Sequence, residues 1–241
     1  MIVLDKLSYA YPRSQGGEIR EVLRDISLQI RDGEFVTVLG RSGCGKTTLV
    51  NILSSFITSY SGKVLINGNV ATMPAKNRIV VNQEHDLFEW MTVWENMKLV
   101  TDDERSIAKY LKLVGLDKVQ NRYPHKLSGG MKKRLSLARA LSVNPEFLIL
   151  DEPFASLDYI TQQGLITELD MLFSVTKKTT LLVTHNIEEA IYLSDRIIIL
   201  GGRPATIHNE ICIDFDHPRK IEIKNTIKYV NYIKRIKNSY L

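Results

Sequence analysis

Residues 40–47 read Gly40-Arg41-Ser42-Gly43-Cys44-Gly45-Lys46-Thr47, between a strand-like run at 35–39 and an apolar stretch that begins at Leu49. A strand, a glycine-rich loop and a helix in this order are the context that a phosphate-binding loop requires. The glycines allow the backbone N–H groups to turn inward, and the helix N-terminus adds partial positive charge. We expect Lys46 to reach the β- and γ-phosphates of a nucleotide and the Thr47 hydroxyl to ligate Mg²⁺.

The composition is that of a globular protein with a sizeable core. The chain has 241 residues, of which 44% are hydrophobic and 24% are charged. No apolar run approaches the roughly eighteen residues of a membrane span, and the N-terminus lacks the pattern of a signal peptide. Cys44 and Cys212 have no metal-ligand spacing, so a reducing cytosol fits and Cys44 is expected to be a small loop residue.

The positive charge is concentrated in the C-terminal tail. The net charge is +5, and residues 218–241 hold seven Lys or Arg and one acid, which leaves the remainder at −1. No stacking aromatic module accompanies this charge, so we expect a solvated helix face and no nucleic-acid partner. A weak attraction to anionic lipid headgroups stays open.

The hydrophobic pattern predicts an α/β core interrupted by a helical insertion. Helical spacing replaces strand-like runs between about 86 and 141, and a helix is expected at 159–173. The tail also has helical spacing, which predicts a helix docked on the core. The expected strands are short apolar runs, several of them suited to a parallel sheet buried on both faces, at 2–11, 26–30, 63–66, 79–81, 147–150, 181–183 and 197–200.

Two carboxylates, Asp151 and Glu152, directly follow the apolar run 147–150. In a phosphate-loop protein an acid at a strand end can hold the Mg²⁺ shell, and Asp151 has that place. Glu152 can then orient and deprotonate the attacking water. An acidic pair in this position can also simply begin a helix, but two separate signals for phosphate chemistry favour the catalytic interpretation.

A second anion-binding candidate is the Ser128-Gly129-Gly130 turn, which opens a predicted helix. Taken alone, such a turn is a helix N-cap. The two candidate phosphate sites lie in different parts of the chain. Both could contact one nucleotide if two copies pack head to tail.

Six motifs in this order and spacing make the chain resemble an ATP-binding subunit of an ABC transporter: 40–47, Gln83, 127–131, 150–152, 156–158 and His185. The resemblance implies a P-loop NTPase (RecA-like) core over 1–85 and 142–205, with an N-terminal antiparallel β subdomain. It further implies an inserted helical subdomain over 86–141 and a short extension over 206–241, within one domain. ATP and Mg²⁺ are the implied cofactors.

The resemblance also assigns roles to single residues. Tyr11 resembles the aromatic that stacks on adenine, although a strand-end core role is equally open. Gln83 resembles the loop glutamine that touches Mg²⁺ or water and senses the membrane partner, and Asp158 resembles the loop that crosses the dimer. His185 resembles the switch histidine on the γ-phosphate. Ser128, Gly129 and Gly130 resemble the signature that contacts ATP held by the other copy, and Thr48 completes the nucleotide-binding set.

Details of the motifs resemble the nitrate/sulfonate/taurine importer group, notably Met131 and the phrase 83–90. The implied partners are membrane permease subunits, a second ATPase copy and, indirectly, an extracytoplasmic solute-binding protein. The implied location is peripheral, on the cytoplasmic face of the cell membrane. Three positions depart from the group's pattern: Glu89 replaces a usual Pro, Lys133 replaces a common Gln, and 51–56 lacks the usual Gly-Leu.

Several alternatives stay open at this point. The chain could be an exporter subunit, a non-transport ABC ATPase or a regulatory module that binds nucleotide without turnover. An apolar cluster follows Gln83, and we expect part of it to be core and the rest to line a groove for a helix of the membrane subunit. Its members are Leu87, Phe88, Trp90, Met91, Val93, Trp94 and Met97.

Overall fold

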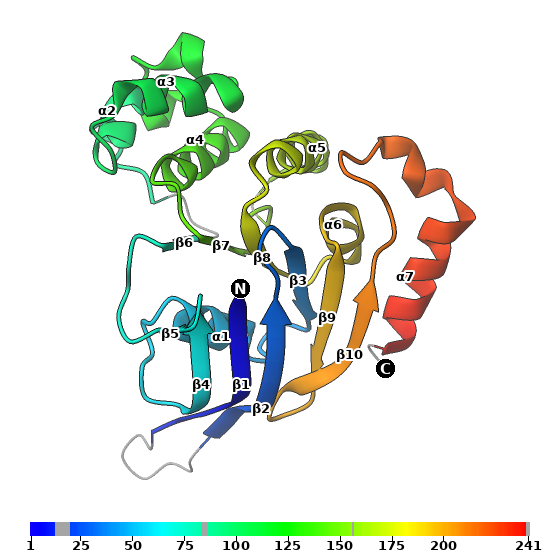
Figure 1. The fold of residues 1–241 in the computed structure, drawn as a ribbon. Helices are drawn as coiled ribbons and strands as arrows, with labels where there is room; N and C mark the ends of the chain where they lie inside the picture. The colour runs from blue at the N-terminus through cyan, green and yellow to red at the C-terminus, as the bar shows by residue number, and fades with distance from the viewer. Residues whose placement is uncertain (13–19, 83–85, 156, 240–241) are drawn as a thin grey trace.

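Two β-sheets form the centre of the protein (Figure 1). The computed structural model describes residues 1–12, 20–82, 86–155 and 157–239. The larger sheet has the strand order β10-β9-β3-β8-β7-β6, with β10 antiparallel to β9 and the other neighbours parallel. Its strands are β3 (Phe35–Gly40), β6 (Arg78–Val81), β7 (Phe147–Asp151), β8 (Thr179–Thr184), β9 (Arg196–Gly201) and β10 (Thr206–Cys212).

The central strands are apolar throughout because both faces of this sheet are covered. Every residue of β3 is buried. Val36 and Val38 pack toward helix α1 (Lys46–Leu53) and the smaller sheet, whereas Phe35 packs toward the helices on the opposite face. The predicted α/β core is therefore confirmed, and the strands predicted at 63–66, 79–81, 147–150, 181–183 and 197–200 are all present.

Because the strands are parallel, the loops that follow β3, β7 and β8 lie at one edge of the sheet. Leu39 of β3 pairs with Thr184 of β8, and Val183 of β8 pairs with Asp151 of β7. The loop after β3, the carboxylates after β7 and His185 after β8 consequently leave the sheet at the same edge. This is the edge at which ligands bind in open α/β sheets.

The smaller sheet is antiparallel with the order β2-β1-β4-β5. Its strand β2 begins six residues earlier than predicted, because Asp25 takes a left-handed φ of 49° and the register with β1 shifts nearby. This irregularity hides the alternation of apolar residues before Ile26 in the sequence. The strands are β1 (Ile2–Tyr11), β2 (Arg20–Ile30), β4 (Ser61–Ile66) and β5 (Asn69–Val70).

The insertion between β6 and β7 is helical, as predicted, and forms a separate layer at the upper left of Figure 1. Ser128 caps its last helix by accepting a hydrogen bond from the Met131 N–H. The layer contains α2 (Val93–Lys98), α3 (Glu104–Leu113), α4 (Gly129–Ser142) and the 3₁₀ turns η1 (Asp117–Val119) and η2 (Pro124–Lys126). Helices α5 (Tyr159–Thr176) and α6 (Ile187–Leu193) cover the same face of the large sheet.

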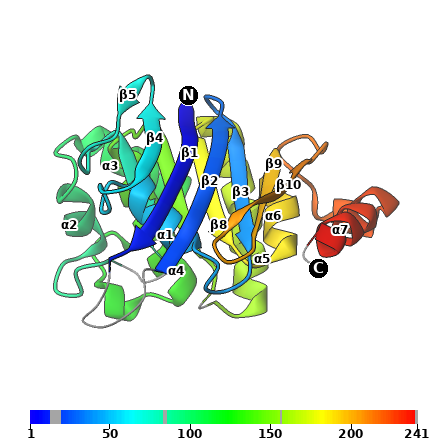
Figure 2. The same cartoon turned by 90° about the horizontal axis from the view of Figure 1, so that it is seen from below.

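The C-terminal extension contains a strand that the sequence did not reveal. β10 is an edge strand with few apolar residues, so its pattern is weak. The extension continues through η3 (Ile221–Asn225) into α7 (Ile227–Ser239), which docks through the buried Tyr229 and Ile236 as predicted. Seen from below, α7 lies at the opposite side of the molecule from α2 and α3 (Figure 2).

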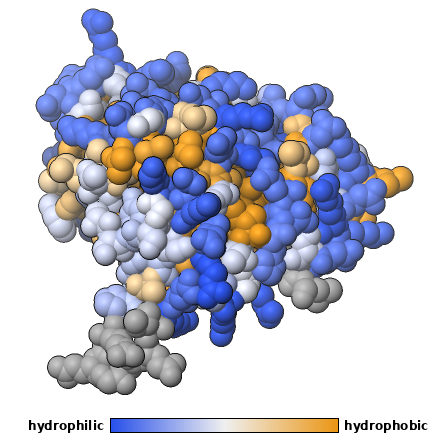
Figure 3. Space-filling model, turned by 60° about the horizontal axis from the view of Figure 1, so that its bottom comes forward, coloured by the Kyte–Doolittle hydropathy of each residue, from blue (hydrophilic) through white to orange (hydrophobic). Residues whose placement is uncertain are grey.

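Hydrophobic surface on the face shown in Figure 3 is gathered mainly in its middle, and most of the remainder is hydrophilic. Within the described residues, no helix combines the length and the apolar character needed to cross a bilayer.

Candidate nucleotide-binding and hydrolysis site

The glycine-rich loop joins the end of β3 to the start of α1. Gly45 is the N-cap of α1 with a φ of 107°, and no side chain caps this helix. A Cβ on Gly45 would lie 2.9 Å from Val22 Cγ1, so only glycine fits. An uncapped helix start leaves backbone N–H groups free to bind an anion.

Lys46 lies at the floor of this loop with only 5% of its surface exposed. Its Nζ donates hydrogen bonds to the carbonyl oxygens of Gly40 at 2.9 Å and Arg41 at 3.2 Å. The same Nζ lies 3.6 Å from Glu152 Oε1. The ammonium is therefore held between the loop and the end of β7, where a phosphate chain would meet both.

Glu152 connects Lys46 to His185. Its Oε2 lies 3.2 Å from His185 Nδ1. The Glu152 backbone has a φ of 43°, which is uncommon for a residue with a side chain, and its N–H donates to the Val183 carbonyl at 2.9 Å. Such conformations concentrate at functional sites. The structure thus places the two proposed catalytic residues side by side.

Asp151 precedes Glu152 at the strand end. Burial raises the pKa of its carboxyl group and the neighbouring Glu152 raises it further, while Lys46 and Lys133 oppose the shift. A partly buried carboxylate of this kind is stabilised by a cation. Thr47, which is exposed in the first turn of α1, and Asp151 border the same cavity.

These two oxygen donors fit Mg²⁺ as nucleotide sites hold it. No group of three or more His, Cys, Asp or Glu that could hold a metal ion occurs in the part of the chain that the structure describes. Mg²⁺ in phosphate sites usually needs only one or two protein ligands, with substrate phosphates and water completing the shell. Thr47 and Asp151 are the residues that would hold it.

A cavity of about 320 Å³ opens over the loop. Tyr11 at the end of β1 borders it with 42% of its surface exposed, and its hydroxyl lies 3.2 Å from Thr48 Oγ1. Tyr11 is therefore not a core residue, and its stacking on adenine stays a prediction. Arg20 and Val22 were not predicted to line this cavity, because only the pairing of β2 with β1 brings them here. The cavity is lined by Tyr11, Arg20, Val22, Ser42, Gly43, Gly45, Lys46, Thr47, Thr48, Asp151 and Glu152.

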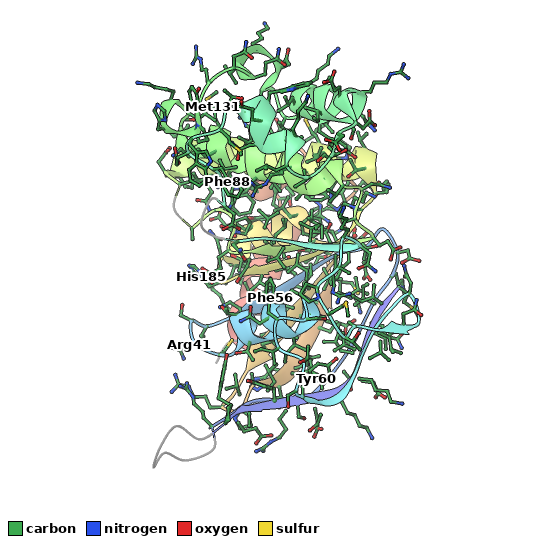
Figure 4. All side chains as sticks on the ribbon, turned by 90° about the vertical axis from the view of Figure 1, so that its left-hand side faces the viewer. Arg41, Phe56, Tyr60, Phe88, Met131 and His185 are labelled. Atoms are coloured by element: carbon green, nitrogen blue, oxygen red, sulfur yellow. The ribbon has the colours of Figure 1, made fainter. Side chains whose placement is uncertain are left out.

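The signature residues Ser128–Gly130 are absent from this lining. They begin α4 in the helical layer, where a Cβ on Gly130 would lie 2.7 Å from Thr161 Cγ2 of α5. Figure 4 shows the adjacent Met131 in the upper layer and Arg41 and His185 in the core below. Asp158 caps α5 by accepting a hydrogen bond from the Thr161 N–H at 3.0 Å. One chain therefore does not bring its two candidate phosphate sites together.

Gln83 lies outside the described residues, but the chain on either side of it borders a second cavity of about 510 Å³. This cavity, here called the groove, lies between β6 and α4 and is lined by Ile79, Val80, Val81, Asn82, Asp86, Phe88, Leu99, Val100, Ser136, Arg139, Ala140 and Val143.

The apolar cluster after Gln83 divides between core and surface. Val93 and Met97 are fully buried, and Leu87 and Trp94 are partly buried against the same core. Phe88 lines the groove with 39% exposure. Trp90 packs edge-on against Phe88 and is 72% exposed. An exposed aromatic pair beside an apolar groove is typical of an interaction surface.

Comparison with known proteins gives consistent similarities. Residues 23–155 match the family model described as ABC transporter. The chain is 39% identical to a bicarbonate transport ATP-binding protein of Synechocystis sp. (90% of this chain, 80% of the other) and 39% identical to a nitrate import ATP-binding protein of Synechococcus elongatus (90% and 83%). It is 40% identical to an aliphatic sulfonates import ATP-binding protein of Bacillus thuringiensis (87% and 85%).

A solved structure is also similar over most of the chain. It is the dimeric post-hydrolysis state of an ATP-binding cassette bound to ADP and Pi, with a TM-score of 0.75 and 29% sequence identity. The match covers 90% of this chain and 100% of that one.

Proposed function

Because this chain belongs to the ABC transporter family, we propose that it hydrolyses ATP to drive uptake of a small solute through a separate membrane permease. The relatives named for bicarbonate, nitrate and sulfonate import favour import over export and over a non-transport role. All three of those solutes are small oxyanions, so a solute of this class is the proposal.

The observation that carries the proposal is the grouping of Lys46 and His185 around the Glu152 carboxylate at one edge of the sheet, while the signature lies elsewhere. Lys46 and His185 both lie within 4 Å of the Glu152 carboxylate. The signature lines no part of the cavity over the loop. A second copy placed head to tail would supply it, and the similarity to a dimeric cassette supports this arrangement.

We assign the chemical roles from the contacts. The loop N–H groups and Lys46 bind the phosphates, and Glu152 accepts a proton from the attacking water. His185, adjacent to Glu152, is placed to contact the γ-phosphate. Mg²⁺, held by Thr47 and Asp151, would neutralise charge on the phosphates. Ser128–Gly130 of the partner copy would close on the γ-phosphate, so hydrolysis would weaken the closed dimer.

The groove is the proposed docking site for a cytoplasmic helix of the permease. Phe88 provides an apolar contact there, and Asn82 and Asp86, which lie on either side of residues 83–85, also line the groove. Docking would place the subunit peripherally on the cytoplasmic face of the membrane. An extracytoplasmic solute-binding protein would act on it only through the permease.

Glu152→Gln tests the catalytic assignment. The variant should keep ATP binding and lose turnover by at least ~10²-fold, the scale of a lost general base. Light scattering should then detect an ATP-dependent dimer that the wild type forms only transiently. Near-normal turnover in this variant would remove Glu152 from the role of base.

Ser128→Glu tests the composite site. A carboxylate facing the γ-phosphate should abolish ATP-dependent dimerisation, since like charges repel, while ADP binding to the single chain stays unchanged. Wild-type turnover by monomers of this variant would contradict the head-to-tail arrangement. Purification of the wild type from cells separates transport from non-transport functions. A multispanning membrane protein that co-purifies with it would support transport, whereas co-purifying RNA would support a non-transport function.

A further inference from the structure

Lys133 is a buried cation that the roles assigned above do not use. It lies in the second turn of α4, three residues after Gly130, and its exposure is 0%. Lysine is almost never fully buried unless its ammonium group is paired. A buried ammonium beside the signature therefore calls for an explanation.

The side chain of Lys133 reaches from the helical layer to the edge of the large sheet. Its Nζ donates a hydrogen bond to the Asn82 carbonyl oxygen at 2.5 Å. Asn82 directly follows β6, whose last residue, Val81, pairs with Leu150 of β7. By this parallel register, Asn82 is level with Asp151 on the neighbouring strand. The signature helix thus contacts the chain beside the proposed Mg²⁺ ligand.

The acidic groups near Lys133 are consistent with an ammonium group at the edge of the large sheet. Burial lowers its pKa to about 8, whereas Asp86 and Asp151 favour the charged form. In turn, Lys133 is one of the two cations that favour ionised Asp151, with Lys46. At neutral pH the ammonium is mostly charged, and it acts on the same carboxylate as a bound divalent cation would.

Neighbouring contacts fix the same segment. The Asn82 side-chain amide donates to Asp86 Oδ2 at 2.9 Å, and Arg139 of α4 donates to the Asp86 carbonyl. Lys133 and Arg139 therefore tie α4 to the chain on both sides of Gln83. Asn82, Asp86 and Arg139 also line the groove, so this segment borders both the proposed docking surface and the sheet edge.

We propose that Lys133 is a positioning residue that joins the signature helix to the Mg²⁺ edge of the ATP site. Its ammonium holds Asn82 in place and competes electrostatically with a divalent ion at Asp151. Movement of α4 would shift this charge and alter metal affinity. The inference rests on the proposed ATPase site, but it does not depend on which solute is carried.

Binding of Mn²⁺ in the presence of ADP, followed by electron paramagnetic resonance, tests the electrostatic part. Lys133→Gln and Lys133→Met should each bind Mn²⁺ about fivefold more tightly, because a competing unit charge is removed. Hydrogen exchange at the backbone amides of Asn82 and Asp86, on either side of residues 83–85, should accelerate in both variants. With Mg²⁺-ATP, kcat should fall while KM changes little.

Lys112→Gln is the matched control, since Lys112 is an exposed lysine on α3 of the same layer. It should leave Mn²⁺ affinity, exchange and kcat at wild-type values. Unchanged Mn²⁺ affinity in both Lys133 variants, even with a lower melting temperature, would reduce Lys133 to a packing role and overturn the proposal. If Glu152→Gln keeps near-normal turnover while the Lys133 variants still bind Mn²⁺ more tightly, the catalytic assignment is wrong and the inference about Lys133 stands.

Discussion

Two peripheral parts of the molecule are attached to the same core by different polar contacts. The signature junction comprises Asn82, Asp86, Lys133 and Arg139 and joins the helical layer to β6. The C-terminal junction comprises Asp170, Tyr192, His217 and Arg219 and joins the extension to α5 and α6. The helices α2 and α3 of the layer lie on the opposite side of the molecule from α7 of the extension (Figure 2). Both junctions contain buried charge.

The C-terminal junction is a closed network. Asp170, with 1% exposure, accepts hydrogen bonds from the His217 ring and the Arg219 N–H. The Arg219 guanidinium donates to the carbonyls of Ile191 at 2.6 Å and Ser194 at 2.8 Å. The Tyr192 hydroxyl donates to the Arg219 carbonyl at 2.6 Å. Each partner constrains the others, so the geometry is fixed in several directions.

The signature junction combines polar and apolar contacts. Between described residues, Lys133 and Arg139 donate to the backbone carbonyls of Asn82 and Asp86, and α4 also packs into an apolar core that it shares with α5 and β7. Apolar contact is non-directional, so small shifts of the layer cost less than they would in a closed network. The two junctions therefore differ in their directional contacts: a polar network fixes the extension, whereas the helical layer is also held by apolar packing that tolerates small shifts.

Arg219→Met offers the largest test of this contrast. It removes a buried cation and leaves the carbonyls of Ile191, Ser194 and Phe215 without its hydrogen bonds. At roughly 1.5–3 kcal/mol for each hydrogen bond to a charged group, the expected cost is at least about 3 kcal/mol. We expect urea denaturation to show this loss and limited proteolysis to cleave near 213–239. Turnover at low temperature should change little. Lys220→Met, at an exposed neighbouring position, is the control and should behave as wild type.

If Arg219→Met instead reduces turnover as strongly as the Lys133 variants do, the two junctions are not distinct in kind. The C-terminal network would then belong to the mechanism. If stability is unaffected, the network is not what holds the extension.

Much of this organisation was predictable from the sequence, and the exceptions have physical causes. The loop at 40–47, the acids at 151–152 and His185 each follow an apolar strand, so local pattern locates them at one sheet edge. The burial of Lys133 was not predictable. Its neighbours in the sequence are Lys132 and Arg134, and only the packing of α4 against β6 distinguishes it.

Long-range pairing explains the other features that could not be predicted from the sequence. Arg20 and Val22 reach the cavity through the pairing of β2 with β1, which the bulge near Asp25 conceals. The contact of Asp170 with His217 joins residues 47 positions apart. Charged residues of this kind look like solvated surface in a sequence, because nothing local shows that each will meet a partner.

A test with an effect of intermediate size is the pH dependence of the stability that His217 provides. Burial alone would lower its pKa, but its contact with Asp170 and its proximity to Asp195 (3.4 Å) raise the pKa above the ordinary 6.5, with Arg219 opposing. A raised pKa means that the folded state binds the proton more tightly. The resulting stabilisation is complete below pH 6.5 and is lost as pH rises through the folded-state pKa.

Urea unfolding of wild type and His217→Gln between pH 5 and 9 measures this contribution. We expect the variant to lose about 1–3 kcal/mol at low pH, the scale of a hydrogen bond to a charged group, and less at high pH. Exposed His208, replaced by Gln, is the control. A difference between His217→Gln and wild type that grows with pH would contradict a protonated His217 in the network.

The smallest expected effect concerns the exposed ion pair between Arg134 of α4 and Glu168 of α5, which also spans the helical layer and the core. Their side chains are 30% and 48% exposed, and such pairs usually contribute less than about 1 kcal/mol. A double-mutant cycle with Arg134→Met and Glu168→Gln should give a coupling free energy in that range. The pair Lys98–Glu104, which lies within the layer, is the control cycle. A coupling of several kcal/mol between Arg134 and Glu168, absent from the control, would show that the layer is held as firmly as the extension. In that case α4 could not shift easily, and the proposed effect of its movement on metal affinity would lose its basis.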